Sequence, residues 1–78
     1  MQLIITRTAE KALRRMPGKD AAALIEKLKG YAQTGQGDVK KLVGQPYYRL
    51  RHGDWRAIFE IEGDVIVIRI AHRREVYE

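Results

Sequence analysis

The 78-residue sequence contains no cysteine, two prolines, one tryptophan and one phenylalanine. Without cysteine the chain cannot form a disulfide framework, a thiolate zinc site or a cysteine nucleophile, which fits a reducing compartment. Long apolar runs are also missing, because the longest, residues 65–68, is far shorter than the roughly 20 residues that cross a bilayer. Since the chain opens directly on a strand-like pattern, we expect no export signal, no membrane anchor and a cytoplasmic location.

Acidic residues are outnumbered, with ten Asp and Glu against fifteen Lys and Arg, so the formal net charge is +5. Such an excess favours nucleic acid or an acidic protein as partner. A hydrophobic content of 45% with 32% charged residues is typical of a folded chain, and the length allows one domain, residues 1–78. The basic residues of the second part are all arginine, whose planar fork matches phosphate. They are Arg49, Arg51, Arg56, Arg69, Arg73 and Arg74.

Hydrophobic spacing predicts three elements in the first half. Residues 3–5 are β-branched or apolar and indicate a short strand. Apolar residues of 9–16 then recur at helical spacing, with Thr8 as the expected N-cap. A second amphipathic helix follows Asp20 and ends at the glycines beginning with Gly35, so the two helices form a hairpin.

The second half begins with a polar connection over residues 38–46 and then changes to a period of two. Alternation from Tyr47 onward predicts three strands joined by tight turns, the last reaching about Ala71. The expected fold is α+β in the order β-α-α-β-β-β. It has an N-terminal strand, a helical hairpin and a three-stranded antiparallel meander, with the helices packed on one face of the sheet.

Turn length decides which side chains share a face of this meander. A two-residue first loop, either 52–53 or 53–54, places Tyr48 and Leu50 on the apolar face that receives the helices. A second turn at Gly63 and Asp64 aligns Ala57, Phe59 and Ile61 with Ile66, Ile68 and Ile70 on that same face. The opposite face collects Tyr47, Arg49, Arg51, Arg56 and Arg69, with Arg73 added if the strand continues past Ala71.

Two interpretations of this arginine face remain open. It is either a solvated surface partly offset by Glu60 and Glu62, or a phosphate-binding surface. Like charges opposed across a ladder are destabilising by about 0.2–1 kcal/mol, which favours a functional reason for the arginines. Tyr47 is either a platform for an RNA base or ordinary packing, and parity places Trp55 in the core.

Several motifs closely resemble those of the RelE/ParE superfamily, small toxins of prokaryotic toxin–antitoxin pairs. They are Tyr-Arg-Leu-Arg at 48–51, Gly-Asp-Trp-Arg at 53–56 and His-Arg-Arg-Glu-Val-Tyr at 72–77. The resemblance extends over nearly the whole chain and agrees with the expected fold. RelE-type members cut mRNA in the ribosomal A site, so the resemblance implies a ribosome-dependent endoribonuclease without a metal or other cofactor. It implies as catalytic residues Arg49, Arg51, Arg56, Arg73 and Tyr77.

The chemistry suits these residue types, because attack by an RNA 2′-hydroxyl builds negative charge on the phosphate oxygens. Guanidinium groups of Arg56 and Arg73 would stabilise this charge, while Arg49 and Arg51 would orient the backbone. Tyr77 would stack on a base or take part in proton transfer. Further RNA contacts are expected from Tyr47, Lys40, Lys41, Arg69, His72 and Arg74.

His72 is also a candidate general acid, although a histidine at a strand end is more often structural. With two histidines and no cysteine, we expect no metal site. The implied partners are a cognate antitoxin, the ribosome with its 16S rRNA, and mRNA, with operator DNA reached only through the antitoxin and no membrane. Two alternatives share the fold: a ParE-type poison of DNA gyrase, and an inactive member that binds only its antitoxin.

Overall fold

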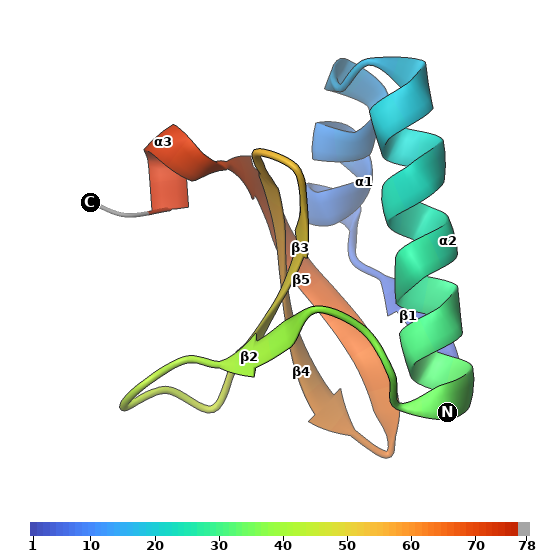
Figure 1. The fold of residues 1–78 in the computed structure, drawn as a ribbon, viewed down its shortest axis with the longest axis vertical. Helices are drawn as coiled ribbons and strands as arrows, with labels where there is room; N and C mark the ends of the chain where they lie inside the picture. The colour runs from blue at the N-terminus through green and yellow to red at the C-terminus, as the bar shows by residue number, and fades with distance from the viewer. Residues whose placement is uncertain (77–78) are drawn as a thin grey trace.

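The apolar residues of the helices and strands meet in one layer between a five-stranded sheet and two helices (Figure 1). This computed structural model describes residues 1–76, and it confirms the predicted α+β fold with a leading strand and a helical hairpin. The elements in chain order are β1 (Leu3–Ile5), α1 (Arg7–Arg15), α2 (Gly18–Thr34), β2 (Val39–Lys41), β3 (Tyr48–His52), β4 (Trp55–Glu62), β5 (Asp64–His72) and α3 (Arg73–Val76).

The sheet has the strand order β1-β5-β4-β3-β2. The meander β3-β4-β5 is antiparallel as expected, and β1 lies parallel to β5 at one edge. Figure 1 shows α1 and α2 together on one face and α3 on the opposite face. No helix within residues 1–76 has the length and apolar character needed to cross a membrane.

The prediction of a polar connection over 38–46 was wrong at its start, where β2 forms a second edge strand. Val39 pairs with Leu50 and packs against the core, while Lys40 and Lys41 are exposed. A three-residue strand with two lysines gives too little alternation to be recognised in a sequence. Short, charged edge strands also resist pairing with other chains.

The first helix is capped by Thr6 and not by the expected Thr8. The Thr6 side chain accepts a hydrogen bond from the Ala9 N–H at 3.4 Å and donates one to the Val67 carbonyl at 2.8 Å. The same hydroxyl therefore begins α1 and fastens it to β5. The second helix begins at Gly18, ahead of the expected Asp20, because the carbonyl of the N-cap residue Pro17 already accepts a helical hydrogen bond from the Ala21 N–H at 3.0 Å.

Strand β5 departs from the predicted register. Glu62 pairs with Asp64 around the single residue Gly63, whose φ of 75° permits the tight turn. Phe59 consequently faces Val67, so Ile66 and Ile68 do not lie on the helix-facing side as expected. A bulge between Ile58 and Phe59 restores the alignment further on, where Ala57 pairs with Ile70 as predicted.

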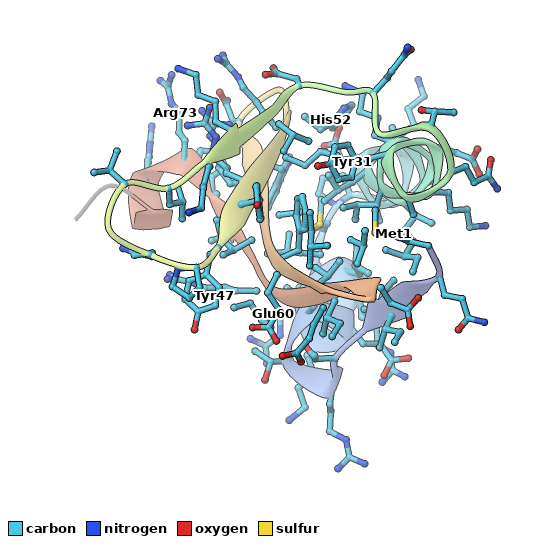
Figure 2. All side chains as sticks on the ribbon, turned by 90° about the horizontal axis from the view of Figure 1, so that it is seen from below. Met1, Tyr31, Tyr47, His52, Glu60 and Arg73 are labelled. Atoms are coloured by element: carbon cyan, nitrogen blue, oxygen red, sulfur yellow. The ribbon has the colours of Figure 1, made fainter. Side chains whose placement is uncertain are left out.

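The core forms between α2 and the helix-facing side of the sheet. Its largest fully buried side chains are Leu24, Leu28, Leu50, Phe59, Val65 and Val67. Tyr31 of α2 and Tyr48 of β3 both pack on the Phe59 ring, with centroids 5.4 and 5.6 Å away. In Figure 2, Tyr31 points toward the sheet from the α2 side, whereas Tyr47 and Arg73 lie away from that helix.

Candidate RNA-binding site

The β3–β4 hairpin fixes the arginines of the candidate site. His52 pairs with Trp55, which confirms a two-residue loop and selects Gly53–Asp54 from the two loops considered. In this register Arg51 lies directly opposite Arg56, and Arg49 lies opposite Ile58. The three arginines therefore share the face away from α1 and α2, as the alternation predicted.

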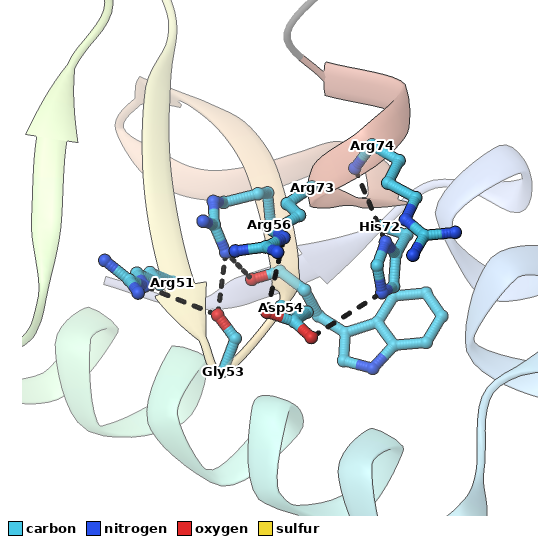
Figure 3. A network of polar contacts seen from close by, with 8 residues as sticks. Arg51, Gly53, Asp54, Arg56, His72, Arg73 and Arg74 are labelled. Carbon is cyan, nitrogen blue, oxygen red and sulfur yellow. Dashed lines mark hydrogen bonds and ion pairs between the residues drawn. The ribbon is translucent and has the colours of Figure 1, made fainter.

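The carbonyl of Gly53 binds two of these side chains. It accepts hydrogen bonds from Arg56 Nη1 at 2.8 Å and from Arg51 Nε at 3.3 Å, as Figure 3 shows. Arg56 Nη1 also donates to the Trp55 carbonyl at 3.2 Å. Two guanidinium groups are thus held on one turn, even though their mutual repulsion opposes this arrangement.

Arg56 differs from the exposed arginine that the sequence suggested, because only 4% of its surface is accessible. Its neighbour on the same face, Ile58, is also buried, and α3 contacts both β4 and β5 on this side. Arg51 is exposed and Arg49 is half-buried. The surface of the site is therefore formed by Arg51 and Arg49, with the Arg56 charge lying beneath it.

Arg73 reaches the site from α3 and not by the straight continuation of β5 that we considered. Its backbone N–H donates to the Asp54 carbonyl at 2.6 Å, and its Nε lies 3.7 Å from Asp54 Oδ1. This attachment brings a third arginine to the turn that already holds Arg51 and Arg56 (Figure 3). The arginines thus converge from three segments of the chain, β3, β4 and α3.

His72 completes a small polar network around Asp54. Its Nε2 lies 3.8 Å from Asp54 Oδ2, and its Nδ1 accepts the Arg74 N–H at 3.4 Å. A neutral ring that accepts at Nδ1 carries its proton on Nε2, directed toward the carboxylate. The Trp55 ring meets the His72 ring edge-on, with centroids 5.3 Å apart. Asp54, His72, Arg73 and Arg74 line a shallow hollow at this end of the sheet.

Asp54 is the site residue that sequence reasoning missed, since it was assigned only to a turn. Its two carboxylate oxygens contact Arg73 and His72, nearly twenty positions along the chain. One feature of the sequence could have indicated this role of Asp54. Asp54 precedes Trp55, and the pairing of β4 with β5 places Trp55 opposite His72.

The remaining predicted residues divide between faces. Lys40 pairs with Arg49 on the arginine face, whereas Lys41 pairs with Tyr48 on the helix-facing side of the sheet. Tyr47 is half-buried ahead of β3. Arg69 is exposed and pairs with Ile58, so the register places it on the arginine face as predicted, at a part of β5 that β1 does not pair with. Tyr77 lies outside the described residues. Among residues 1–74, whose side chains the structure describes, no group of three or more acidic or histidine side chains is arranged to hold a metal ion.

Comparisons with known proteins agree with this architecture. The family model of the ParE toxin of the type II toxin–antitoxin system parDE matches residues 3–77. Toxin RelE3 of Methanocaldococcus jannaschii is 32% identical, and the alignment covers 100% of this chain and 97% of that protein.

Solved structures show the same fold. The RelB–RelE antitoxin–toxin complex of Methanococcus jannaschii gives a TM-score of 0.79 at 28% identity, covering 95% of this chain and 94% of the other. The toxin–antitoxin complex RelBE2 of Mycobacterium tuberculosis also gives 0.79, at 23% identity and with 92% and 96% coverage. On the strength of the family match and the 32% identical relative, this chain belongs to the RelE/ParE superfamily of toxins from type II toxin–antitoxin systems.

Proposed function

We propose that this toxin is a ribosome-dependent endoribonuclease that cuts mRNA in the A site through attack of an RNA 2′-hydroxyl. The supporting observation is the convergence of Arg51, Arg56 and Arg73 on the Gly53–Asp54 turn. A relative named RelE3 and a RelE fold neighbour agree with this assignment. Because the solved structures with this fold are toxin–antitoxin complexes, a cognate antitoxin is the expected regulatory partner.

The reaction needs positive charge where the phosphate becomes more negative. The 2′-oxygen attacks phosphorus, a cyclic phosphate forms, and the 5′-oxygen leaves and takes up a proton. Arg73 is 56% exposed on its side chain and held by Asp54, so its guanidinium is available to a phosphate oxygen. Removing one such preorganised donor lowers a rate by about 10²–10³-fold.

The other arginines support the same step. Arg51 and Arg49 orient the RNA backbone from β3, and Lys40 extends the basic face across the β2–β3 ladder. Buried Arg56 positions the turn through its two carbonyl contacts and adds a fixed charge below the phosphate. Tyr77 follows α3 in the sequence and is proposed to stack on a base or to assist proton transfer.

Asp54 and His72 are the side chains of the hollow whose chemistry allows a proton to be accepted or donated. We assign them first to positioning, because both imidazole nitrogens and both carboxylate oxygens already face partners in this network. Their shared contact orients Arg73 toward solvent. A direct proton-transfer role of His72 is the second assignment.

The matching family model is named for ParE toxins, so a poison of DNA gyrase is the second candidate function. Purified protein added to programmed ribosomes separates the two. We expect new mRNA 5′ ends in the A-site codon, lost in Arg73→Ala and retained in Glu62→Gln, a charge variant at the far end of the hairpin. Intact mRNA together with stalled gyrase cleavage complexes would contradict the nuclease proposal.

A further inference from the structure

A basic hollow lies between α1 and the free edge of β5, outside the site described above. Strand β1 pairs with β5 only at residues 65–67, so the rest of that β5 edge is left to α1. Thr8, Lys11 and Arg15 of α1 line the hollow together with Arg69 of β5. Lys11, Arg15 and Arg69 are all exposed at this hollow.

Shared lining residues link this hollow to two further depressions, the last of which lies at the Gly53–Asp54 turn. Arg15 also borders a second depression, where it is joined by Trp55 and His72. His72 in turn borders the third, which contains Arg73 and Arg74. We call this path the α1–β5 groove and define it by Lys11, Arg15, Arg69, Trp55 and His72. It leads from α1 across the end of the sheet to the arginine that we place at the scissile phosphate.

The chemistry of the groove fits a single-stranded nucleic acid. Lys11 and Arg15 are one helical turn apart, roughly 6 Å along the axis, so they can contact neighbouring phosphates. The half-buried Trp55 lines the same depression as Arg15, and aromatic rings next to a basic track are the usual platform for unpaired bases. Glu10, an acidic residue of α1, is paired with Arg14 at 3.6 Å.

We infer that the α1–β5 groove binds single-stranded RNA that flanks the cleaved linkage, with Lys11, Arg15 and Arg69 on phosphates and Trp55 under a base. This inference rests on the proposed nuclease function for the identity of the strand. It adds a binding track on α1 that the arginine face does not contain. Lys11 and Arg15 hold the strand, and Arg73 marks the junction with the site of chemistry.

The affinity of the purified protein for RNA tests the α1–β5 groove in the absence of the ribosome. The probe is a fluorescein-labelled twelve-nucleotide oligouridylate, followed by anisotropy over a range of salt concentrations. The double variant Lys11→Gln with Arg15→Gln should bind about tenfold more weakly. It should also lower the slope of log K against log salt by about 1.4, since each single-strand phosphate contact contributes about 0.7. The matched control, Arg7→Gln with Arg14→Gln, removes the same charge from the same helix and should change affinity less than twofold.

Trp55 is the single tryptophan of the chain, so its fluorescence reports on base stacking directly. Unlabelled oligouridylate should quench it, whereas inorganic polyphosphate of equal charge should bind without quenching. Equal losses in the two double variants would overturn the inference, because binding would then follow net charge alone. Tighter, Lys11- and Arg15-dependent binding of polyglutamate would overturn it in favour of an acidic protein segment.

The outcomes also separate this inference from the proposed function. RNA binding in the groove without mRNA cleavage on ribosomes would refute the nuclease and retain the groove. Cleavage with no effect of the Lys11 and Arg15 changes on binding would refute the groove and retain the nuclease.

Discussion

Arg56 is the arginine whose surroundings differ most from the solvent-facing position that strand alternation suggests. It is 4% exposed and donates to two carbonyls of the β3–β4 turn. Arg56→Ala should therefore lower the free energy of unfolding by about 2–3 kcal/mol, since hydrogen bonds from a charged group are worth about 1.5–3. Arg51→Ala, on an exposed side chain of the same turn, should stay within about 0.5 kcal/mol.

Urea denaturation of both variants measures this difference. Arg56→Lys adds a second comparison, because it keeps the charge and loses the guanidinium whose Nη1 donates to both carbonyls. We expect Arg56→Lys to unfold between the wild-type protein and Arg56→Ala. Equal midpoints for Arg56→Ala and Arg51→Ala would show that Arg56 does not hold the turn.

Asp54 allows the positioning assignment to be separated from stability. Asp54→Asn removes the charge that faces Arg73 and His72 while keeping nearly the same shape. Because the side chains of Asp54 and Arg73 are both 56% exposed, the unfolding free energy should change by less than about 1 kcal/mol. Cleavage on programmed ribosomes should fall about tenfold, as expected when a reacting group is held less firmly.

The comparison for Asp54→Asn is Glu62→Gln, which removes the same charge from the other end of β4. It should leave the cleavage rate unchanged. Equal rates for wild-type protein and Asp54→Asn would refute the idea that this carboxylate orients Arg73. A large loss of stability in Asp54→Asn would instead make it a structural residue of the turn.

Among the elements, those with a clear period and an unambiguous turn could be predicted from sequence. Alternation over β3 and β4 gave the shared face of Arg49, Arg51 and Arg56, because the Gly53–Asp54 loop fixes the register. The single-residue turn at Gly63 and the compensating bulge were not predictable, because residues 65–68 of β5 form an unbroken apolar run that does not mark which side chains face the core. The Asp54–Arg73 contact depends on α3 folding back, which no local pattern indicates.

The start of α1 provides a test at this scale. Thr6→Ala should cost about 1–2 kcal/mol, because it removes both the cap on Ala9 and the hydrogen bond to Val67. Thr8→Ala, at the position that the sequence suggested as the cap, lies in the exposed first turn and should cost less than about 0.5 kcal/mol. Thermal unfolding of the two variants measures the difference. A larger loss in Thr8→Ala would place the functional cap at Thr8.

At the scale of the whole molecule, small size and positive charge act together. A chain of this length buries only about 60–65% of its unfolded surface, so its stability depends strongly on what binds the native state. The net charge of +5 repels within the fold and attracts acidic partners. Opposed cations such as Lys40 and Arg49 add to that repulsion. A partner that supplies carboxylates to the basic surface around Lys40 and Arg49 would therefore reduce the charge repulsion and also add contacts to the native state.

Cognate antitoxin should accordingly act as a stabiliser as well as an inhibitor. A ligand that binds only the native state at 100 times its Kd adds about 2.7 kcal/mol, which for a domain of this size raises Tm by roughly 10–20 °C. Calorimetry of the toxin with increasing amounts of the antitoxin measures this, and the rise should continue with the logarithm of its concentration. Polyglutamate at equal charge serves as the comparison and should give a smaller rise that disappears in high salt, because screening removes charge attraction but leaves apolar contacts intact. An antitoxin that abolished toxicity without raising Tm would have to bind the unfolded chain as well as the folded one, and its inhibition could not then arise from occupying the native surface described here.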